Sequence, residues 1–227
     1  MTCKRSAGCR LIAVALVAVG LLCGFLATSP ASADTINYTI NVPNAALVGF
    51  APPYAEVNVN RTDATHATIT FTRDNGYLIG GAQAADVNVN ATGFTVGSLA
   101  CSPIATCGPL SNPGGGNVSS FGSFNVNIDS FDGPTNAATL ISFILTNTGG
   151  TWLTAADVLI NNASGFLAAA HIFAGCTVTG CVATGFAANG LPQQPVPEPA
   201  TLLLLGSGLV GLGGGALKRR WAARRVA

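Results

Sequence analysis

The chain has 227 residues and a formal net charge of +1, with 49% hydrophobic and 8% charged residues. All nine acidic residues lie between Asp34 and Glu198, and this interval holds only two of the ten basic residues, Arg61 and Arg73, so that it carries a net charge of −7. Because phosphate binding requires clustered Lys and Arg, this distribution excludes nucleic acid as a partner of the acidic region.

Residues 1–33 have the organisation of a secretory signal peptide. A basic start is followed by an uncharged apolar run over residues 11–27 and by the small residues Ala31-Ser32-Ala33, which are typical of a cleavage site. We therefore predict an exported protein that is cut between Ala33 and Asp34, so that the mature chain begins at Asp34. The positive charges of the basic start are Lys4, Arg5 and Arg10.

From Asp34 onward, apolar and polar residues alternate with the period of two that is typical of a half-buried strand. The alternation is clearest in residues 36–42, where the apolar positions are separated by Asn and Thr. We expect residues 34–189 to form a mostly β domain of about eight to ten strands, arranged as a single antiparallel, jelly-roll-like β-sandwich. The alternation recurs at residues 57–59, 67–71, 87–89 and 124–128.

Four segments within this domain carry more specific predictions. The continuous apolar run Leu140–Leu145 predicts a central strand that is buried on both faces. Asp74-Asn75-Gly76 is typical of a hairpin turn, and the Pro- and Gly-rich residues 103–116 indicate a surface loop. Ala155–Asp157 could form one helical turn.

Four cysteines remain once the signal peptide is removed, and an even number in an oxidising compartment indicates disulfides. Three pairings are open, of which the short spacings favour Cys101–Cys107 and Cys176–Cys181. The alternative is a zinc site of four thiolates, although such sites usually have tighter spacing and export disfavours reduced thiols.

We expect no catalytic residue, metal or cofactor in the domain. His66 and His171 have no His, Cys or Glu at ligand spacing, so we expect an exposed His66 on a strand and a packed or hydrogen-bonded His171. The alternative is a secreted carbohydrate-active hydrolase, but such enzymes usually need two nearby carboxylates and Glu56 is the one glutamate of the domain. Asp129 and Asp132 flank a turn and could at most form a weak Ca²⁺ site.

Three features follow one another in the C-terminal part of the sequence. Residues 190–200 form a polar linker containing Pro197, Glu198 and Pro199, and we expect this motif to be extended and exposed because proline fixes φ and donates no N–H. Residues 201–217 are uncharged and would span about 26 Å as a helix, which predicts a transmembrane helix. Residues 218–227 then form a basic tail held on the cytoplasmic side by Lys218, Arg219, Arg220, Arg224 and Arg225.

This order of motif, apolar segment and arginine cluster resembles the PEP-CTERM sorting signal of exported bacterial proteins. The resemblance rests on Val196–Thr201 and the residues after it, and it covers only this part of the chain. It implies that an exosortase-like processing enzyme recognises Pro197-Glu198-Pro199, cuts near it and releases or transfers the protein.

The resemblance also implies where the protein resides and what it meets there. We expect a precursor anchored in the inner membrane by its C-terminal helix, and then a non-enzymatic protein of the cell surface or extracellular matrix. Its expected partner there is extracellular polysaccharide, in exopolysaccharide or biofilm. The alternative is a periplasmic domain held by a simple C-terminal membrane anchor.

Overall fold

The computed structural model describes residues 33–103, 107–130, 133–177 and 180–190. The signal sequence before Ala33, the linker with the Pro-Glu-Pro motif after Gly190, the predicted transmembrane helix and the basic tail lie outside the described residues. Among the residues that are described, no helix is long and apolar enough to cross a membrane.

The described residues between Asp34 and Asn189 are mostly β-strands, as the alternating sequence predicts. Short 3₁₀ helices, η1 (Ala45–Leu47), η2 (Pro134–Asn136) and η3 (Ala155–Asp157), interrupt the connections, and η3 confirms the predicted helical turn. The strands are β1 (Asp34–Pro43), β2 (Ala55–Arg61), β3 (His66–Arg73), β4 (Leu78–Ile79), β5 (Ala85–Val87), β6 (Phe94–Ser102), β7 (Ser111–Val118), β8 (Gly122–Asp129), β9 (Leu140–Asn147), β10 (Ala168–Ala174) and β11 (Ala183–Asn189).

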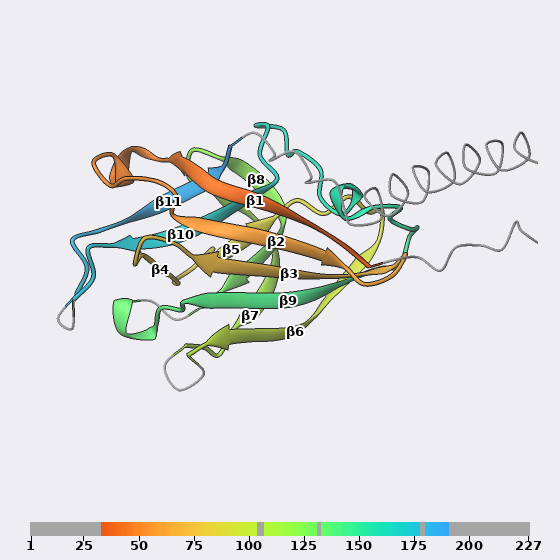
Figure 1. Ribbon diagram of the computed structural model, residues 1–227, viewed down its shortest axis with the longest axis horizontal. Coiled ribbons are helices and arrows are strands. Elements are labelled where there is room, and N and C mark those ends of the chain that lie inside the picture. The colour runs from red at the N-terminus through yellow and green to blue at the C-terminus, as the bar shows by residue number, and fades with distance from the viewer. Residues whose placement is uncertain (1–32, 104–106, 131–132, 178–179, 191–227) are drawn as a thin grey trace, which may run out of the picture.

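All strand pairs are antiparallel, and they form one 11-stranded sheet in the order β6-β9-β3-β2-β1-β11-β10-β5-β8-β7, with β4 paired to β10. The sheet folds over on itself into a nearly closed structure, so that β1, β2, β3, β9 and β6 form one layer and the remaining strands lie behind it (Figure 1). The predicted antiparallel β class is confirmed. The two layers are not separate sheets, because hydrogen bonding continues from β1 into β11.

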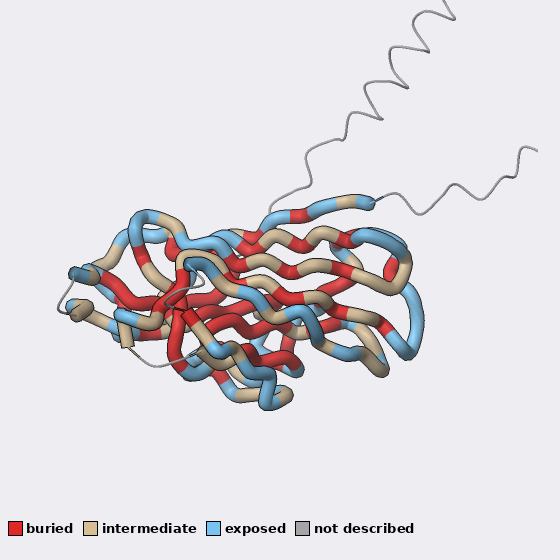
Figure 2. Tube along the Cα trace, turned by 90° about the horizontal axis from the view of Figure 1, so that it is seen from below, coloured by how far each residue is buried: buried red, intermediate tan, exposed pale blue. Residues whose placement is uncertain are grey.

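One apolar core fills the space between the two layers. Along each strand, buried residues alternate with half-buried or exposed ones, which Figure 2 shows as repeated colour changes along the chain. Because successive side chains point to opposite faces of a strand, this alternation places one apolar row per strand inside the fold. Fully buried members of this core from both layers include Ile40, Val57, Ile69, Phe71, Val87, Val126, Ile128, Ile141, Phe143, Leu145 and Ile172.

Three local predictions need correction. Leu140–Leu145 forms most of β9, but only Ile141, Phe143 and Leu145 are buried, because β9 lies next to the edge strand β6 and its other face is only half covered. The predicted loop 103–116 contains the start of β7, because strands pair through their backbones and need no large side chains. The register of β7 against β8 shifts at two irregularities, which accommodate the Pro and Gly residues.

The third correction concerns Asp74-Asn75-Gly76. The tight turn is present, with positive φ values of 46° at Asn75 and 76° at Gly76, and the amide of Tyr77 donates to Asp74 O at 2.9 Å. It does not form a hairpin, because the short strand β4 that follows the turn pairs with β10 instead of β3.

Candidate functional site

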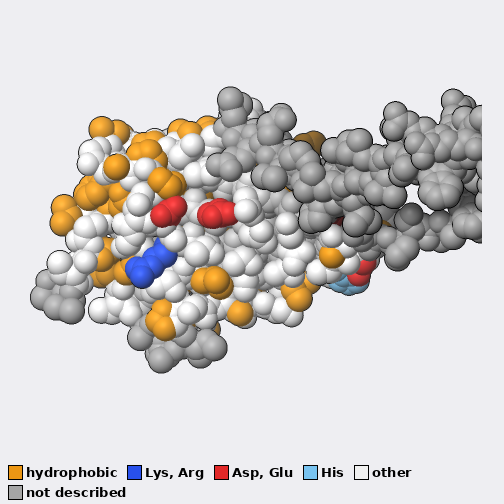
Figure 3. Space-filling model, in the orientation of Figure 1, with side chains coloured by type: hydrophobic (Ala, Val, Ile, Leu, Met, Phe, Trp, Pro, Cys, Tyr) orange, Lys and Arg blue, Asp and Glu red, His pale blue; other side chains and the backbone are white. Residues whose placement is uncertain are grey.

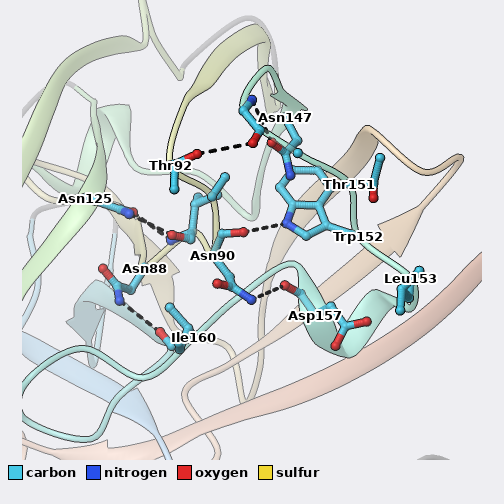
Figure 4. Close-up of a pocket in the computed structure, with 14 residues that line it drawn as sticks. Asn88, Asn90, Thr92, Asn125, Asn147, Thr151, Trp152, Leu153, Asp157 and Ile160 are labelled. Carbon is cyan, nitrogen blue, oxygen red and sulfur yellow. Dashed lines mark hydrogen bonds between the residues drawn. The ribbon is translucent and has the colours of Figure 1, made fainter.

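A polar cleft lies where the segment after β5 meets the segment after β9. Its volume is about 640 Å³. Side chains reach it from chain segments far apart in sequence, and most of those labelled in Figure 4 end in an amide, a hydroxyl or a carboxylate. The cleft is lined by Asn88, Val89, Asn90, Ala91, Thr92, Asn125, Asn147, Gly149, Gly150, Thr151, Trp152, Leu153, Asp157 and Ile160.

Trp152 and Asn125 hold the backbone of the cleft in place. The Trp152 side chain is buried, and its indole N–H donates to the carbonyl of Asn90 at 2.8 Å. The amide group of Asn125 bonds to both polar atoms of the Val89 backbone, donating to the carbonyl at 2.8 Å and accepting from the N–H at 2.7 Å. Both polar atoms of the Val89 backbone are thereby hydrogen-bonded as they would be in a strand pair. The Asn125 side chain therefore holds this segment in place beyond Val87 and Val126, where the pairing of β5 with β8 ends.

The two asparagines that flank Val89 are oriented by the opposite wall. The side-chain N–H groups of Asn88 and Asn90 donate to the carbonyls of Ile160 and Asp157 at 3.0 and 2.9 Å (Figure 4). An asparagine amide also carries an acceptor oxygen. Within the described residues, these hydrogen bonds use only the nitrogen of each amide, so both side-chain oxygens are left to accept from a ligand.

The cleft contains one ionisable side chain, Asp157, and its carboxylate oxygen Oδ2 accepts from the N–H and hydroxyl of Thr154 at 2.8 and 2.9 Å. That carboxylate therefore serves to cap η3. Two apolar side chains stand on the rim, since Leu153 is 81% exposed and Ile160 is 49% exposed. The domain surface is similarly poor in charge, and few charged side chains appear on the face shown in Figure 3. Such a site can form hydrogen bonds and apolar contacts with an uncharged ligand.

The two histidines lie on different strands and serve local structure. His66 begins β3, where its ring Nδ1 lies 2.9 Å from Asp63 Oδ2. The backbone N–H of Thr65, and then the His66 side chain, hold the pKa of Asp63 well below its usual range. His171 stacks on Phe186 at 4.4 Å between ring centroids, and its Nε2 lies 2.6 Å from the Thr184 hydroxyl, which confirms a packed and hydrogen-bonded side chain.

Among the described residues, the structure does not place Glu56 opposite a second carboxylate, as a hydrolase site would require. This residue is exposed on β2, where its neighbours in the ladder are Thr39 and Thr72. Asp129 accepts a hydrogen bond from the backbone N–H of Gln83 at 2.8 Å, and Asp132 lies outside the described residues. In the part of the chain that the structure describes, no three His, Cys, Asp or Glu side chains come together as a metal site.

Both favoured disulfides are confirmed. Cys101 is bonded to Cys107, and Cys176 is bonded to Cys181. Each pair closes a short local loop, the first between β6 and β7 and the second between β10 and β11. The four-thiolate zinc alternative is therefore wrong.

The predicted first residue of the mature chain is also the first residue of strand β1. Ala33 is exposed, and Asp34 is the first residue of β1. The carboxylate of Asp34 lies 2.6 Å from Nε of the buried Arg61 and also accepts from the N–H of Ala155 at 2.6 Å. Asp34 therefore contributes to the folded domain through these two contacts. The cleavage between Ala33 and Asp34 itself stays a prediction.

Two functional candidates were missed in the sequence. One is the cleft with its Asn side chains and Trp152, for which an Asn- and Thr-rich sequence gives no local signal. The other is Asp86 on β5, a carboxylate with no exposed surface. Burial, and then the charge of Asp129, raise the pKa of Asp86 well above its usual value. The sequence signal was an acidic residue in the otherwise apolar run Ala84-Ala85-Asp86-Val87.

Comparison with known proteins bears on the C-terminal part of the chain. The family model described as the PEP-CTERM protein-sorting motif matches residues 195–220. No curated protein and no solved structure matches the chain. The chain therefore carries a PEP-CTERM sorting motif, which confirms the resemblance. The motif indicates an exported protein that is targeted to an exosortase-type enzyme and sorted to the cell envelope or surface.

Proposed function

We propose that this chain is a non-enzymatic surface or matrix protein that an exosortase-type enzyme separates from its C-terminal segment, and whose β domain binds extracellular polysaccharide. The observation that carries the proposal is the sorting motif matched at residues 195–220, with Pro197-Glu198-Pro199 inside it. In this account residues 201–217 hold the precursor in the inner membrane until Glu198 and its flanking prolines have been recognised.

The polar cleft is the surface that we assign to polysaccharide. Sugar hydroxyls both donate and accept, and the side-chain oxygens of Asn88 and Asn90 offer acceptors that the fold already holds in position. The exposed Leu153 and Ile160 add apolar contact beside them, as binding sites for small polar ligands commonly do. A lining whose ionisable side chain is the acidic Asp157 suits a neutral glycan better than a phosphorylated or strongly acidic one.

The chemistry of the cleft supports binding over hydrolysis. Glycoside hydrolysis usually uses two carboxylates on opposite sides of the scissile bond. Among the described residues that line the cleft, Asp157 is the one with a carboxylate, and that carboxylate already accepts two hydrogen bonds from Thr154.

The cleft is tested by adding a negative charge at its rim. Leu153→Asp removes an apolar contact at a side chain that is 81% exposed, so the fold should tolerate the change. Val182→Asp is the matched control, because Val182 is 79% exposed and does not line the cleft. The mature proteins are incubated with polysaccharide from the producing strain, and the bound fraction is measured by cosedimentation.

We expect Leu153→Asp to weaken binding by roughly tenfold, which corresponds to about 1.4 kcal/mol, while Val182→Asp binds like the wild type. Equal binding by all three proteins would remove the cleft from the proposal and leave the sorting step untouched. Release of reducing ends from the polysaccharide by the wild type would overturn the non-enzymatic assignment.

A further inference from the structure

Four buried side-chain oxygens in the described part of the chain have no hydrogen-bond partner, and three of them belong to residues that face each other. They are Oδ1 and Oδ2 of Asp86 and Oδ1 of Asn127, while the fourth is the Ser130 hydroxyl. Asp86 has no exposed surface, and Asn127 is 6% exposed. Buried polar atoms are normally hydrogen-bonded, so such a group of unpaired acceptors needs an explanation.

The strand register places these oxygens on one face of the sheet. Asp86 on β5 is directly opposite Asn127 on β8, and directly opposed residues of an antiparallel pair point to the same side. Their neighbours Ala85, Val87, Val126 and Ile128 belong to the main core, so Asp86 and Asn127 point away from it. Asp129 lies two residues after Asn127 on β8 and therefore shares this face.

The neighbouring strand β7 lies beside the amide nitrogen of Asn127. A Cβ atom at Gly116 would lie only 2.6 Å from the amide nitrogen of Asn127, so β7 can approach this closely because residue 116 is glycine. Since β8 lies between β7 and β5, the nitrogen is on the β7 side and the oxygen of the amide is left toward β5 and Asp86.

Acceptor oxygens that face one another need a hydrogen-bond donor or a cation between them. An ionised carboxylate that is buried without a partner is strongly disfavoured, and a second carboxylate close by adds repulsion. Both conditions hold at Asp86, because its side chain has no exposed surface and Asp129 lies on the same face of the sheet. A bound cation would offset the burial penalty and the repulsion and would contact several of these oxygens at once, whereas one proton on Asp86 can bond to only one acceptor.

We infer that Asp86, Asn127 and Asp129 form a binding site for a divalent cation, and that Ca²⁺ is the ion whose chemistry it fits. Ca²⁺ prefers carboxylate and amide oxygens in flexible geometry and completes its coordination with backbone carbonyls or water. Asp129 can contribute although its Oδ1 accepts from the N–H of Gln83, because its second carboxylate oxygen is available for an ion. The site would join β5 to β8 from outside the main core.

Calcium titration of the mature protein tests this site. The protein is stripped with chelator, and its unfolding temperature at neutral pH is measured with increasing CaCl₂ and, in parallel, with MgCl₂. Because only the folded state has the site, Ca²⁺ should raise the unfolding temperature in a saturable manner. We expect a smaller response to Mg²⁺, which requires stricter octahedral geometry.

Two variants assign the response to these residues. Asp86→Asn should abolish the calcium-dependent rise and yet make the metal-free protein more stable, because an unpaired buried carboxyl is replaced by an amide. This double outcome separates loss of a site from failure to fold. Glu56→Gln is the control, since it removes one exposed carboxylate on β2 and should respond to Ca²⁺ like the wild type.

The result that would overturn the inference is a wild-type unfolding temperature that is the same in chelator and in millimolar Ca²⁺. Asp86 would then be held in its protonated form by the fold. A rise that persists in Asp86→Asn would also contradict it, because the calcium would be bound elsewhere.

Discussion

Removal of the Asp34 carboxylate tests whether the fold depends on the first residue of the predicted mature chain. Asp34 Oδ1 lies 2.6 Å from Nε of Arg61, a residue that is only 5% exposed. Asp34 Oδ2 accepts a hydrogen bond from the backbone N–H of Ala155 at 2.6 Å. In Asp34→Ala, the buried guanidinium loses this counter-ion and the Ala155 N–H loses its acceptor.

The cost can be estimated from these contacts. Breaking a fully buried ion pair from one side costs about 3–5 kcal/mol, and the lost hydrogen bond adds about 1 kcal/mol. The Asp34 side chain is 24% exposed, which lets water compensate part of the loss. We therefore expect the free energy of unfolding to fall by about 3 kcal/mol, or the unfolding temperature by roughly 6–12 °C for a domain of this size.

The assay is urea denaturation of the mature protein, after its N-terminus has been verified by mass spectrometry. Asp34→Asn is the control variant, because its amide oxygen can still accept from Ala155 while the charge is lost, and it should lie between the wild type and Asp34→Ala. If the free energy of unfolding of Asp34→Ala lies within about 0.5 kcal/mol of the wild-type value, the ion pair between Asp34 and Arg61 does not stabilise the fold and the reasoning is wrong.

Three further results are expected. The double variant Cys101→Ser/Cys107→Ser should lower the free energy of unfolding by about 2 kcal/mol in urea melts, because the unfolded chain gains entropy when a loop with a sequence separation of 6 is no longer closed. A change near zero would refute this. Gly185→Ala should lower the free energy of unfolding by about 1–3 kcal/mol, since its Cβ would lie 2.7 Å from the side-chain oxygen of Asn44, the residue that caps η1, whereas Gly97→Ala has open space and should cost nothing. The pKa of Asp63 is lowered in the fold, so the stability that its carboxylate contributes is fully present above the unfolded value of 3.8 and is lost progressively as the pH falls from there through the lowered pKa of the folded state. The difference in unfolding temperature between wild type and Asp63→Ala should therefore shrink steadily as the pH falls below 3.8, and a constant difference would contradict this.

Local features of the fold could be predicted because they are encoded in neighbouring residues. The alternation of Ile36, Tyr38 and Ile40 with polar residues sets the buried face of β1 without reference to any partner strand. The short spacing of Cys176 and Cys181 likewise favoured a local disulfide, which the structure contains.

Features that join distant residues could not be predicted in this way. The pairing of Ile40 with Asn189 connects β1 to β11 and turns two expected sheets into one, yet periodicity carries no information about which strands pair. The same limit applies to the Asp74–Gly76 turn, whose residues set a local reversal but not the partner of β4.

The candidate sites depend on the same long-range contacts. Asp86 is buried because β10 and β8 flank it on both sides, and nothing in the residues next to it identifies Asn127 as its neighbour. The cleft is built by Asn90, Trp152 and Asp157 from separate segments, whose hydrogen bonds appear only in the folded chain. The sorting motif is different, because its recognition by an enzyme depends on a contiguous sequence.

The most direct test of the account is the intact mass of the protein recovered from a host that carries the sorting enzyme, compared with that of Glu198→Ala. We expect a wild-type protein that begins at Asp34 and ends near Pro199, and a Glu198→Ala variant that extends to Ala227 and stays with the membrane. A wild-type mass that includes Ala227 would contradict it, because the C-terminal segment would then act only as an anchor.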